Sequence, residues 1–537
     1  MKRGALCLVL LLICGFGRTL AHEGPMPPFQ ASDRCFACHN GLTTPSGEDV
    51  SIGLEWRASM MANSARDPYW QASVRRESLD HPASQVQIED ECATCHMPMA
   101  RAHARSQGRP GQVFVHLGGP TAEPAHREAL DGVSCSLCHQ ISAEKLGEPA
   151  TFNGGFIIAS TPREAPRPEF GPFDIDSGLQ RVMRSSSGGF APTRSDHIRE
   201  SALCASCHTL DTNALGADGR ILGTLQEQQP YQEWLHSSYV NERSCQSCHM
   251  PAVGQPVAIS RVLGEPRDGV ARHRFVAANF FIQRMLNRYR DELSVAAQPA
   301  ELAAAAEHTI NFLGTQAARL SIEQPTLRGS RLELRVRAES LAGHRVPTAY
   351  PSRRAWLHVT LVDANRRVVF ESGALRENGA IQGNDNDLDP ARFEPHYRQI
   401  RSADEVQIYE SILQDSAGHV TTGLLSAVGY LKDNRLLPRG FDKTTALPRI
   451  AVQGDARSDP SFTDRGDLVE YLVDIAAARL PLEARVELLY QPIGYRWAHN
   501  LAPFDAPEPR RFLAWYESMQ SATAVALADA QITIDAR

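Results

Sequence analysis

The chain has 537 residues, of which 42% are hydrophobic and 22% charged, a composition typical of a globular protein and too apolar for a disordered one. Its formal net charge of −7 argues against a nucleic-acid-binding protein, because such proteins need a basic face to neutralise phosphate. Cysteine is the informative residue: two of the 12 lie in the first 14 residues, and the other ten all precede position 250.

The first 21 residues predict a secretory signal peptide. Lys2 and Arg3 form a basic start, residues 5–16 are apolar, and Thr19-Leu20-Ala21 offers small residues before a cleavage site. A retained membrane anchor is the less favoured alternative, because the apolar run is shorter than the ~20 residues that a spanning helix needs. We therefore expect a periplasmic or otherwise exported protein with no membrane span after signal cleavage.

The ten remaining cysteines form five Cys-x-x-Cys-His motifs, numbered here 1 to 5 along the chain. Their residues are Cys35, Cys38 and His39; Cys92, Cys95 and His96; Cys135, Cys138 and His139; Cys204, Cys207 and His208; and Cys245, Cys248 and His249. Composition alone predicts about 0.01 such matches, and the motif is typical of c-type haem attachment. Two thiols would form thioethers to one haem, and the adjacent imidazole would be the proximal ligand of its iron. Thioredoxin-like pairs and zinc sites do not need a histidine at that position. The sequence therefore predicts five haem c groups.

Residues 22–290 are expected to form a loop-rich, mainly helical pentahaem domain. Five haems attached within about 215 residues leave little room for an ordinary apolar core, and this stretch is rich in Gly, Pro and polar residues. The macrocycles would then fill the core.

An internal repeat is visible in this region. Glu55-Trp56-x-x-Ser59 lies between motifs 1 and 2, Glu233-Trp234-x-x-Ser237 lies between motifs 4 and 5, and motifs 2 and 5 both continue as Cys-His-Met-Pro. We interpret this as a duplicated two-haem unit with motif 3 between the copies. Coincidence is the alternative, because the internal spacings differ.

These features resemble the multihaem c-type cytochromes of the cytochrome c-554-like group, which is related to the tetrahaem electron acceptor of hydroxylamine oxidoreductase. The resemblance covers about residues 30–290 and implies an exported carrier that relays electrons between redox donor and acceptor proteins through closely stacked, six-coordinate haems. The alternative is a haem oxidoreductase acting on a small nitrogen or sulfur compound at one five-coordinate haem. Pentahaem ammonia-forming nitrite reductases usually mark that haem with lysine in place of the motif histidine, whereas all five motifs here end in histidine. No catalytic residue is predicted.

Each iron needs a sixth ligand, for which a second imidazole is the expected choice. The haem region holds seven histidines outside the motifs: His81, His103, His116, His126, His197, His236 and His273. In similar proteins such ligands often lie just upstream of a motif, as His126 and His197 do, or in a closing segment, as His273 does. His236 lies in the second Trp-x-x-Ser segment. We predict these four as distal ligands, and the other three fit a hydrogen-bonded histidine equally well.

Met61 occupies the position at which the similar proteins often carry a ligand histidine, two residues after the serine of Trp-x-x-Ser. It is a weaker candidate for a distal thioether ligand, and simple packing against a porphyrin is the favoured alternative.

Beyond residue 290 the chain has no cysteine, and the pattern changes. Residues 291–320 predict a helical connector, and residues 321–537 predict a β-sandwich-like domain with a long insertion at about 375–450. Expected strands include residues 331–337, 356–362, 368–370, 468–475 and 484–490, followed by a closing helix at 512–530. The fold class is therefore α+β.

Two further features of this half were weighed. Gly343-His344-Arg345-Val346-Pro347-Thr348 resembles a segment that often opens the C-terminal domain of large multihaem cytochromes, but a turn histidine is favoured over an iron ligand at His344. Asp385, Asp387 and Asp389 alternate in the insertion and form a candidate calcium site, with a solvated acidic turn as the favoured alternative.

The cysteine pattern makes a first prediction. Because the ten cysteines make five complete motifs, the intact mass of the mature protein should correspond to five covalent haems, with no free thiol and no disulfide. A load of four or fewer haems, after expression with a competent haem-attachment system, would contradict the assignment.

Overall fold

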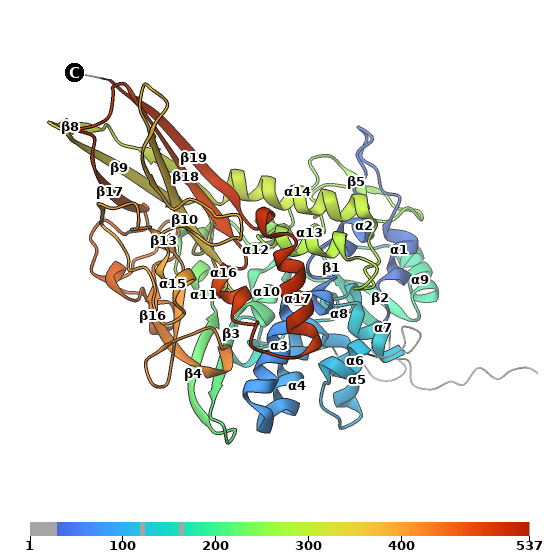
Figure 1. Ribbon diagram of the computed structural model, residues 1–537. Helices are drawn as coiled ribbons and strands as arrows, with labels where there is room; N and C mark the ends of the chain where they lie inside the picture. Colours follow the sequence, from blue (N-terminus) through green and yellow to red (C-terminus); the bar gives the residue numbers. More distant parts are fainter. Residues whose placement is uncertain (1–28, 119–123, 160–165, 536–537) are drawn as a thin grey trace, which may run out of the picture.

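The computed structural model describes residues 29–118, 124–159 and 166–535, and over these ranges the chain is a mixed α+β protein. The expected signal peptide lies outside the described residues. Within those ranges, no helix is long and apolar enough to span a bilayer. Figure 1 shows the long strands on one side of the molecule and most of the short N-terminal helices on the other.

The N-terminal part consists of short helices joined by irregular segments. The helices are α1 Asp33–His39, α2 Ile52–Arg57, α3 Pro68–Asp80, α4 Gln85–His96, α5 Pro98–Ser106, α6 Val113–Gly118, α7 Pro124–Leu130, α8 Cys135–Cys138, α9 Ser177–Ser186, α10 Ser201–His208, α11 Pro230–Leu235 and α12 Cys245–His249. Short strands pair as β1 Arg167–Gly171 with β2 Phe190–Arg194, β3 Leu210–Leu215 with β4 Ile221–Gln228, and β5 Val257–Ala258 with β6 Pro266–Arg267.

Each motif lies on a short helix: α1, α4, α8, α10 and α12. Positions i, i+3 and i+4 share one face of a helix. The two cysteines and the histidine of each motif have this spacing, so a single helical turn presents both thiols and the imidazole on the same side.

The C-terminal part begins with two helices and continues into β-structure. The helices are α13 Phe280–Arg288, α14 Pro299–Gln316, α15 Asp385–Leu388, α16 Tyr495–His499 and α17 Pro507–Glu517. The strands are β7 Ala318–Ile322, β8 Thr326–Arg328, β9 Arg331–Ser340, β10 Arg354–Val362, β11 Val368–Ser372, β12 Gln399–Ile400, β13 Ile408–Tyr409, β14 Ser411–Asp415, β15 Val420–Thr421, β16 Ala427–Asp433, β17 Asp467–Asp474, β18 Leu482–Gln491 and β19 Val525–Ile534.

Two five-stranded sheets dominate this part. One has the order β11-β10-β18-β19, with β13 added to β10, and the other has the order β12-β17-β9-β7, with β8 added to β9. Alternate residues of β9 and β17 are buried, as a half-buried strand requires. The buried side chains of both sheets belong to one hydrophobic cluster, which is how two stacked sheets share a core.

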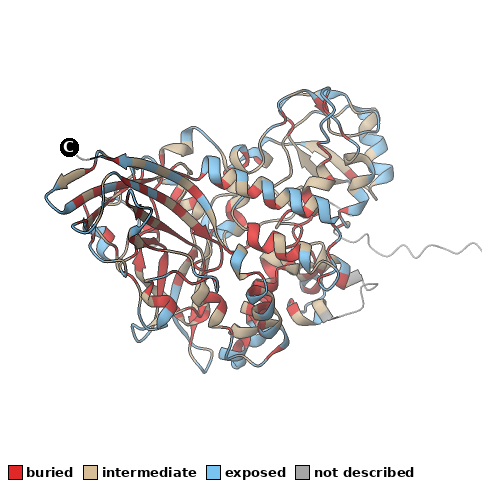
Figure 2. Ribbon diagram, turned by 45° about the horizontal axis from the view of Figure 1, so that its top comes forward, coloured by how far each residue is buried: buried red, intermediate tan, exposed pale blue. Residues whose placement is uncertain are grey.

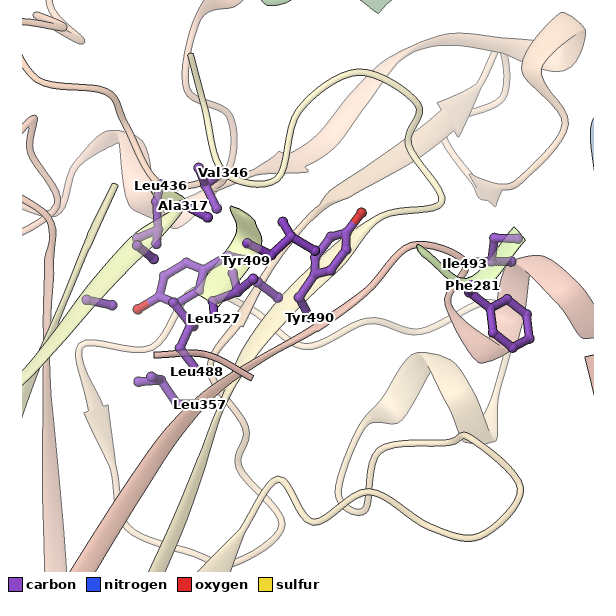
Figure 3. Packing of buried hydrophobic residues seen from close by; sticks show 14 of the residues in the cluster. Phe281, Ala317, Val346, Leu357, Tyr409, Leu436, Leu488, Tyr490, Ile493 and Leu527 are labelled. Atoms are coloured by element: carbon purple, nitrogen blue, oxygen red, sulfur yellow. The ribbon is translucent and has the colours of Figure 1, made fainter. Parts of the chain in front are cut away.

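The same cluster extends into the N-terminal part. It includes Tyr69 of α3 and Leu225 of β4 together with residues of both sheets, and Figure 3 shows part of it, with Val346 near Leu436. Figure 2 shows buried positions running along the strands and into the helices beside them. The two parts of the chain are therefore held together by a continuous apolar core.

The end of the chain differs from the closing helix expected at residues 512–530. Helix α17 ends at Glu517, and Val525–Ile534 form strand β19, which pairs with β18 along its whole length. The alanines at 524, 526, 528 and 530 favour a helix locally. Pairing at the edge of a sheet outweighs that preference.

The insertion is fastened to the sheet by an ion pair. Arg354 of β10 makes two hydrogen bonds to the Asp387 carboxylate, at 2.8 and 2.9 Å, and both side chains are buried. Asp385 instead pairs with Arg392, and Asp389 accepts a backbone N–H. The three carboxylates do not form a group of close metal-ligating atoms in the described part of the chain, so the structure does not support calcium there.

The buried ion pair makes a stability prediction. Asp387→Ala leaves the Arg354 guanidinium buried without its counter-ion, which should lower the free energy of unfolding by about 3 to 5 kcal/mol. Urea denaturation measures this, with Asp389→Ala as the exposed control that should change little. An unchanged unfolding midpoint in Asp387→Ala would show that this ion pair does not hold the insertion.

Candidate functional site

A cavity of about 1030 Å³ lies at the centre of the molecule and is lined mainly by apolar side chains. The cysteines and histidines of motifs 1, 3, 4 and 5 line this cavity, and residues 341–349 of the C-terminal part form another stretch of its wall. Motif 2 lies beside a separate apolar cluster that contains Ala93 and Met97. All ten motif cysteines are free of disulfides.

The motif histidines are held in one orientation by backbone carbonyls. Nδ1 lies 2.6 Å from a carbonyl oxygen in His39, His139 and His249, and 3.0 Å from one in His96. A carbonyl only accepts, so Nδ1 carries the hydrogen, and Nε2 keeps its lone pair. This is the tautomer that a histidine needs to bind a metal through Nε2.

Burial keeps these imidazoles neutral. It lowers the pKa of His96 and His249 to about 4, and that of His273 to about 3, by penalising the charged form. At neutral pH each ring therefore offers a lone pair to a metal ion.

Two pairs of histidine rings lie nearly parallel at similar separations. The ring centroids of His139 and His273 lie 6.4 Å apart with planes 18° from parallel, and those of His249 and His344 lie 6.1 Å apart with planes 7° from parallel. Nδ1 of His273 and of His344 also donates to a backbone carbonyl, at 3.0 and 2.9 Å. Because a metal–imidazole bond is about 2 Å long and the ring centre lies about 1 Å farther out, two rings on opposite sides of one metal ion have centroids about 6 Å apart.

The motifs form one connected group. The neighbouring thiol of Cys135 raises the pKa of Cys35, that of Cys204 lowers the pKa of Cys245, and that of Cys95 raises the pKa of Cys207, so these thiols lie close together. Cys138 of motif 3 also interacts with the thiols of motif 4. Motif 4 therefore has motifs 2, 3 and 5 as its neighbours.

The other histidines predicted as distal ligands have different surroundings. His126, on α7, is 6% exposed, and neither of its ring nitrogens has a hydrogen-bond partner. His197 uses both nitrogens: Nδ1 lies 2.6 Å from the Ser195 hydroxyl and Nε2 lies 2.8 Å from the Ile141 carbonyl. His236 places Nε2 2.9 Å from the Asp442 carbonyl. The structure therefore brings His273, but not His197 or His236, opposite a motif histidine.

The remaining candidates are Met61 and the three other histidines of the haem region. Met61 lines the cavity and packs against Val133 and Leu137 near motif 3. His103 is hydrogen-bonded to Glu128, whereas His81 and His116 each leave one buried ring nitrogen without a partner.

His344, for which the sequence favours a turn histidine, lies in a bend of the chain. It also lines the cavity, with its ring centroid 6.1 Å from that of His249. Its position in a segment that resembles the opening of the C-terminal domain in large multihaem cytochromes was the signal available for it.

The chain combines a mixed α+β fold with five Cys-x-x-Cys-His motifs, four of which line one cavity. Among solved structures, the chain is similar to the penta-heme cytochrome c552 from Thermochromatium tepidum, with a TM-score of 0.52 and 16% sequence identity over 94% of this chain and 99% of that chain. No protein-family model matches the sequence, and no curated protein matches it.

The residues present fit haem c. The thiols and imidazole of each motif share one helical face, four of the motif imidazoles have Nε2 free, and two of these face a second imidazole at the separation that one iron requires. The mostly apolar cavity suits flat, hydrophobic macrocycles. Bound haem would supply a one-electron iron couple.

Proposed function

We propose that the chain is an exported pentahaem c-type cytochrome that relays electrons between redox partner proteins. The observation that carries this proposal is the pair of imidazole gaps, at His139–His273 and His249–His344, within one cavity. Two strong-field ligands on one iron favour a six-coordinate centre that exchanges electrons without binding a substrate.

The contacts between motifs support a relay with a branch. Motif 4 neighbours motifs 2, 3 and 5, and motif 1 neighbours motif 3. Electrons entering near motif 1 would pass motif 3 to reach motif 4, and would leave towards motif 2 or motif 5.

We assign His273, His344 and His126 as the distal ligands at motifs 3, 5 and 2. The first two follow from the ring pairs described above. For His126, α7 packs against α5 and α6, which follow motif 2, and both ring nitrogens are buried without a partner. A buried imidazole with neither nitrogen hydrogen-bonded would be costly unless another group binds it.

The proposal also assigns roles to the parts of the chain. Residues 22–290 hold the haems, residues 291–320 connect, and the β-sandwich of residues 321–537 supplies His344 and a packing surface for the haem region. Membership of the cytochrome c-554-like group, and cleavage of residues 1–21 on export, belong to this proposal as well.

The ligand assignment makes a testable prediction. His273→Ala, His344→Ala and His126→Ala should each convert one low-spin ferric haem to high-spin without changing the haem count, because attachment depends on the thioethers. Absorption and electron paramagnetic resonance (EPR) spectra of the ferric protein measure the spin state. His197→Ala and His236→Ala are matched controls, since Nε2 of each ring already lies on a backbone carbonyl, and a high-spin haem in either would overturn the assignment.

The carrier and the oxidoreductase differ in coordination. A carrier should be almost entirely low-spin when ferric and should bind carbon monoxide poorly when reduced. A high-spin fraction near one fifth, together with turnover of nitrite or hydroxylamine by an artificial electron donor, would instead support a haem oxidoreductase.

A further inference from the structure

The two glutamates of the repeated Glu-Trp-x-x-Ser segments have contacts in common. Glu55, on α2, accepts a hydrogen bond from the backbone N–H of His273 at 2.9 Å. Its other oxygen accepts from the guanidinium groups of Arg272 and Arg274, at 2.9 and 2.8 Å. One carboxylate therefore binds the backbone of the proposed ligand and the side chains of the arginines on either side of it.

Glu233, on α11, does the same for the second pair. It is fully buried, and it accepts a hydrogen bond from the backbone N–H of Arg345, the residue after His344, at 3.1 Å. The Thr348 hydroxyl donates to the same oxygen at 2.6 Å, and the other oxygen lies 3.1 Å from the Arg435 guanidinium. Both carboxylates thus hold a His-Arg dipeptide whose histidine faces a motif.

The tryptophans next to these glutamates are also equivalent. The Trp56 indole N–H donates to the Val133 carbonyl at 3.1 Å, and the Trp234 indole N–H donates to the Arg243 carbonyl at 2.9 Å. Each acceptor lies two residues before the first cysteine of its motif, motif 3 for Trp56 and motif 5 for Trp234.

A further pair of hydrogen bonds fixes the correspondence between the copies. The backbone N–H of Cys135 donates to the Ser32 hydroxyl, and that of Cys245 donates to the Ser201 hydroxyl, at 3.2 and 3.0 Å. Each serine lies three residues before the first cysteine of motif 1 or motif 4. Motif 1 therefore corresponds to motif 4 and motif 3 to motif 5, so the motif between the copies is motif 2, not motif 3 as the sequence pattern suggested.

We propose that Glu55 and Glu233 are positioning residues: Glu55 holds His273, the distal histidine at motif 3, and Glu233 holds His344, the distal histidine at motif 5. In each case the neighbouring tryptophan binds the backbone just before the same motif. This inference rests on the proposed function, because it needs an iron between the paired imidazoles. The distal histidines lie on segments with no helix or strand of their own. A fixed side chain must therefore set their distance and angle.

The negative charge of each carboxylate strengthens this positioning. A hydrogen bond to an ionised acceptor is stronger than one to a neutral acceptor. The flanking arginines neutralise the buried carboxylates, which would otherwise be costly to desolvate. An amide at the same position would keep an oxygen for the backbone N–H but would lose the arginines.

Glu55 is the better residue to test, because its side chain is 10% exposed, whereas Glu233 is fully buried within the Arg345, Asp433 and Arg435 network. Glu55→Ala in the holoprotein should leave five haems attached and turn about one fifth of the ferric haem high-spin, or change the EPR signal of that haem. Glu55→Gln should retain a low-spin haem, because its amide oxygen still accepts from His273. Added imidazole should restore the low-spin signal in Glu55→Ala.

Glu48→Ala is the matched control, because Glu48 pairs with the same two arginines without touching the His273 backbone. It should leave every haem low-spin. Glu55→Ala should also add no further high-spin haem to His273→Ala, since it acts through that histidine. Glu233→Gln provides the second site, where the EPR signal of a different haem should change.

The outcomes distinguish the positioning role of Glu55 from the ligand assignment on which it rests. If His273→Ala produces a high-spin haem while Glu55→Ala keeps the wild-type spin state, EPR signal and midpoint potentials, the positioning role is overturned and the relay stands. If His273→Ala and His344→Ala both leave all five haems low-spin, the ligand assignment fails, and the positioning role fails with it.

Discussion

The proposed arrangement depends on one constraint of coordination chemistry: a haem motif would supply only one face of its iron. A second imidazole would have to come from elsewhere in the chain, and the fold places His273 and His344 near motif histidines. His273 lies beyond all five motifs, and His344 lies beyond the two helices that precede the sandwich. The apolar cluster shared by helices and sheets, and the backbone hydrogen bonds on each Nδ1, keep these remote rings in place.

The same constraint explains why charged residues are buried where the two parts of the chain meet. Arg345 is completely buried between Glu233 and Asp433, and Arg435 joins both acids. These neighbours hold the pKa of the Asp433 carboxyl below its usual range and raise that of the Arg435 guanidinium. Such a network contributes less to stability than apolar packing would, but it fixes the register between the parts. Under the proposed function, His344 precedes Arg345 of this network and depends on that fixed register.

The sequence predicts the local features, but it does not predict those that depend on contacts with residues far away in the chain. The haem motifs follow from residue spacing alone, and the alternation at Leu332, Leu334 and Val336 placed β9 correctly, because both are properties of a short stretch. His344 is an ordinary turn histidine by its neighbours, and only the position of His249 distinguishes it. His197 and His236 have suitable sequence positions, but Nε2 of each ring lies on a backbone carbonyl that no pattern predicts. The sequence of strand β19 predicts a helix, and only its pairing with β18 shows that it is a strand.

The origin of His344 has a consequence for how the molecule is assembled. Cys245 and Cys248 come early in the chain, whereas the segment that carries His344 is held by a residue made later, Leu436, which forms an isolated β-bridge with Val346. A chain emerging from its N-terminus would pass through a state in which motif 5 is loaded but the opposite face of its iron is open to solvent and small ligands. Under the proposed ligand assignment, completion of the sandwich would close that face, and the C-terminal half would protect the cofactor as well as pack against the haem region.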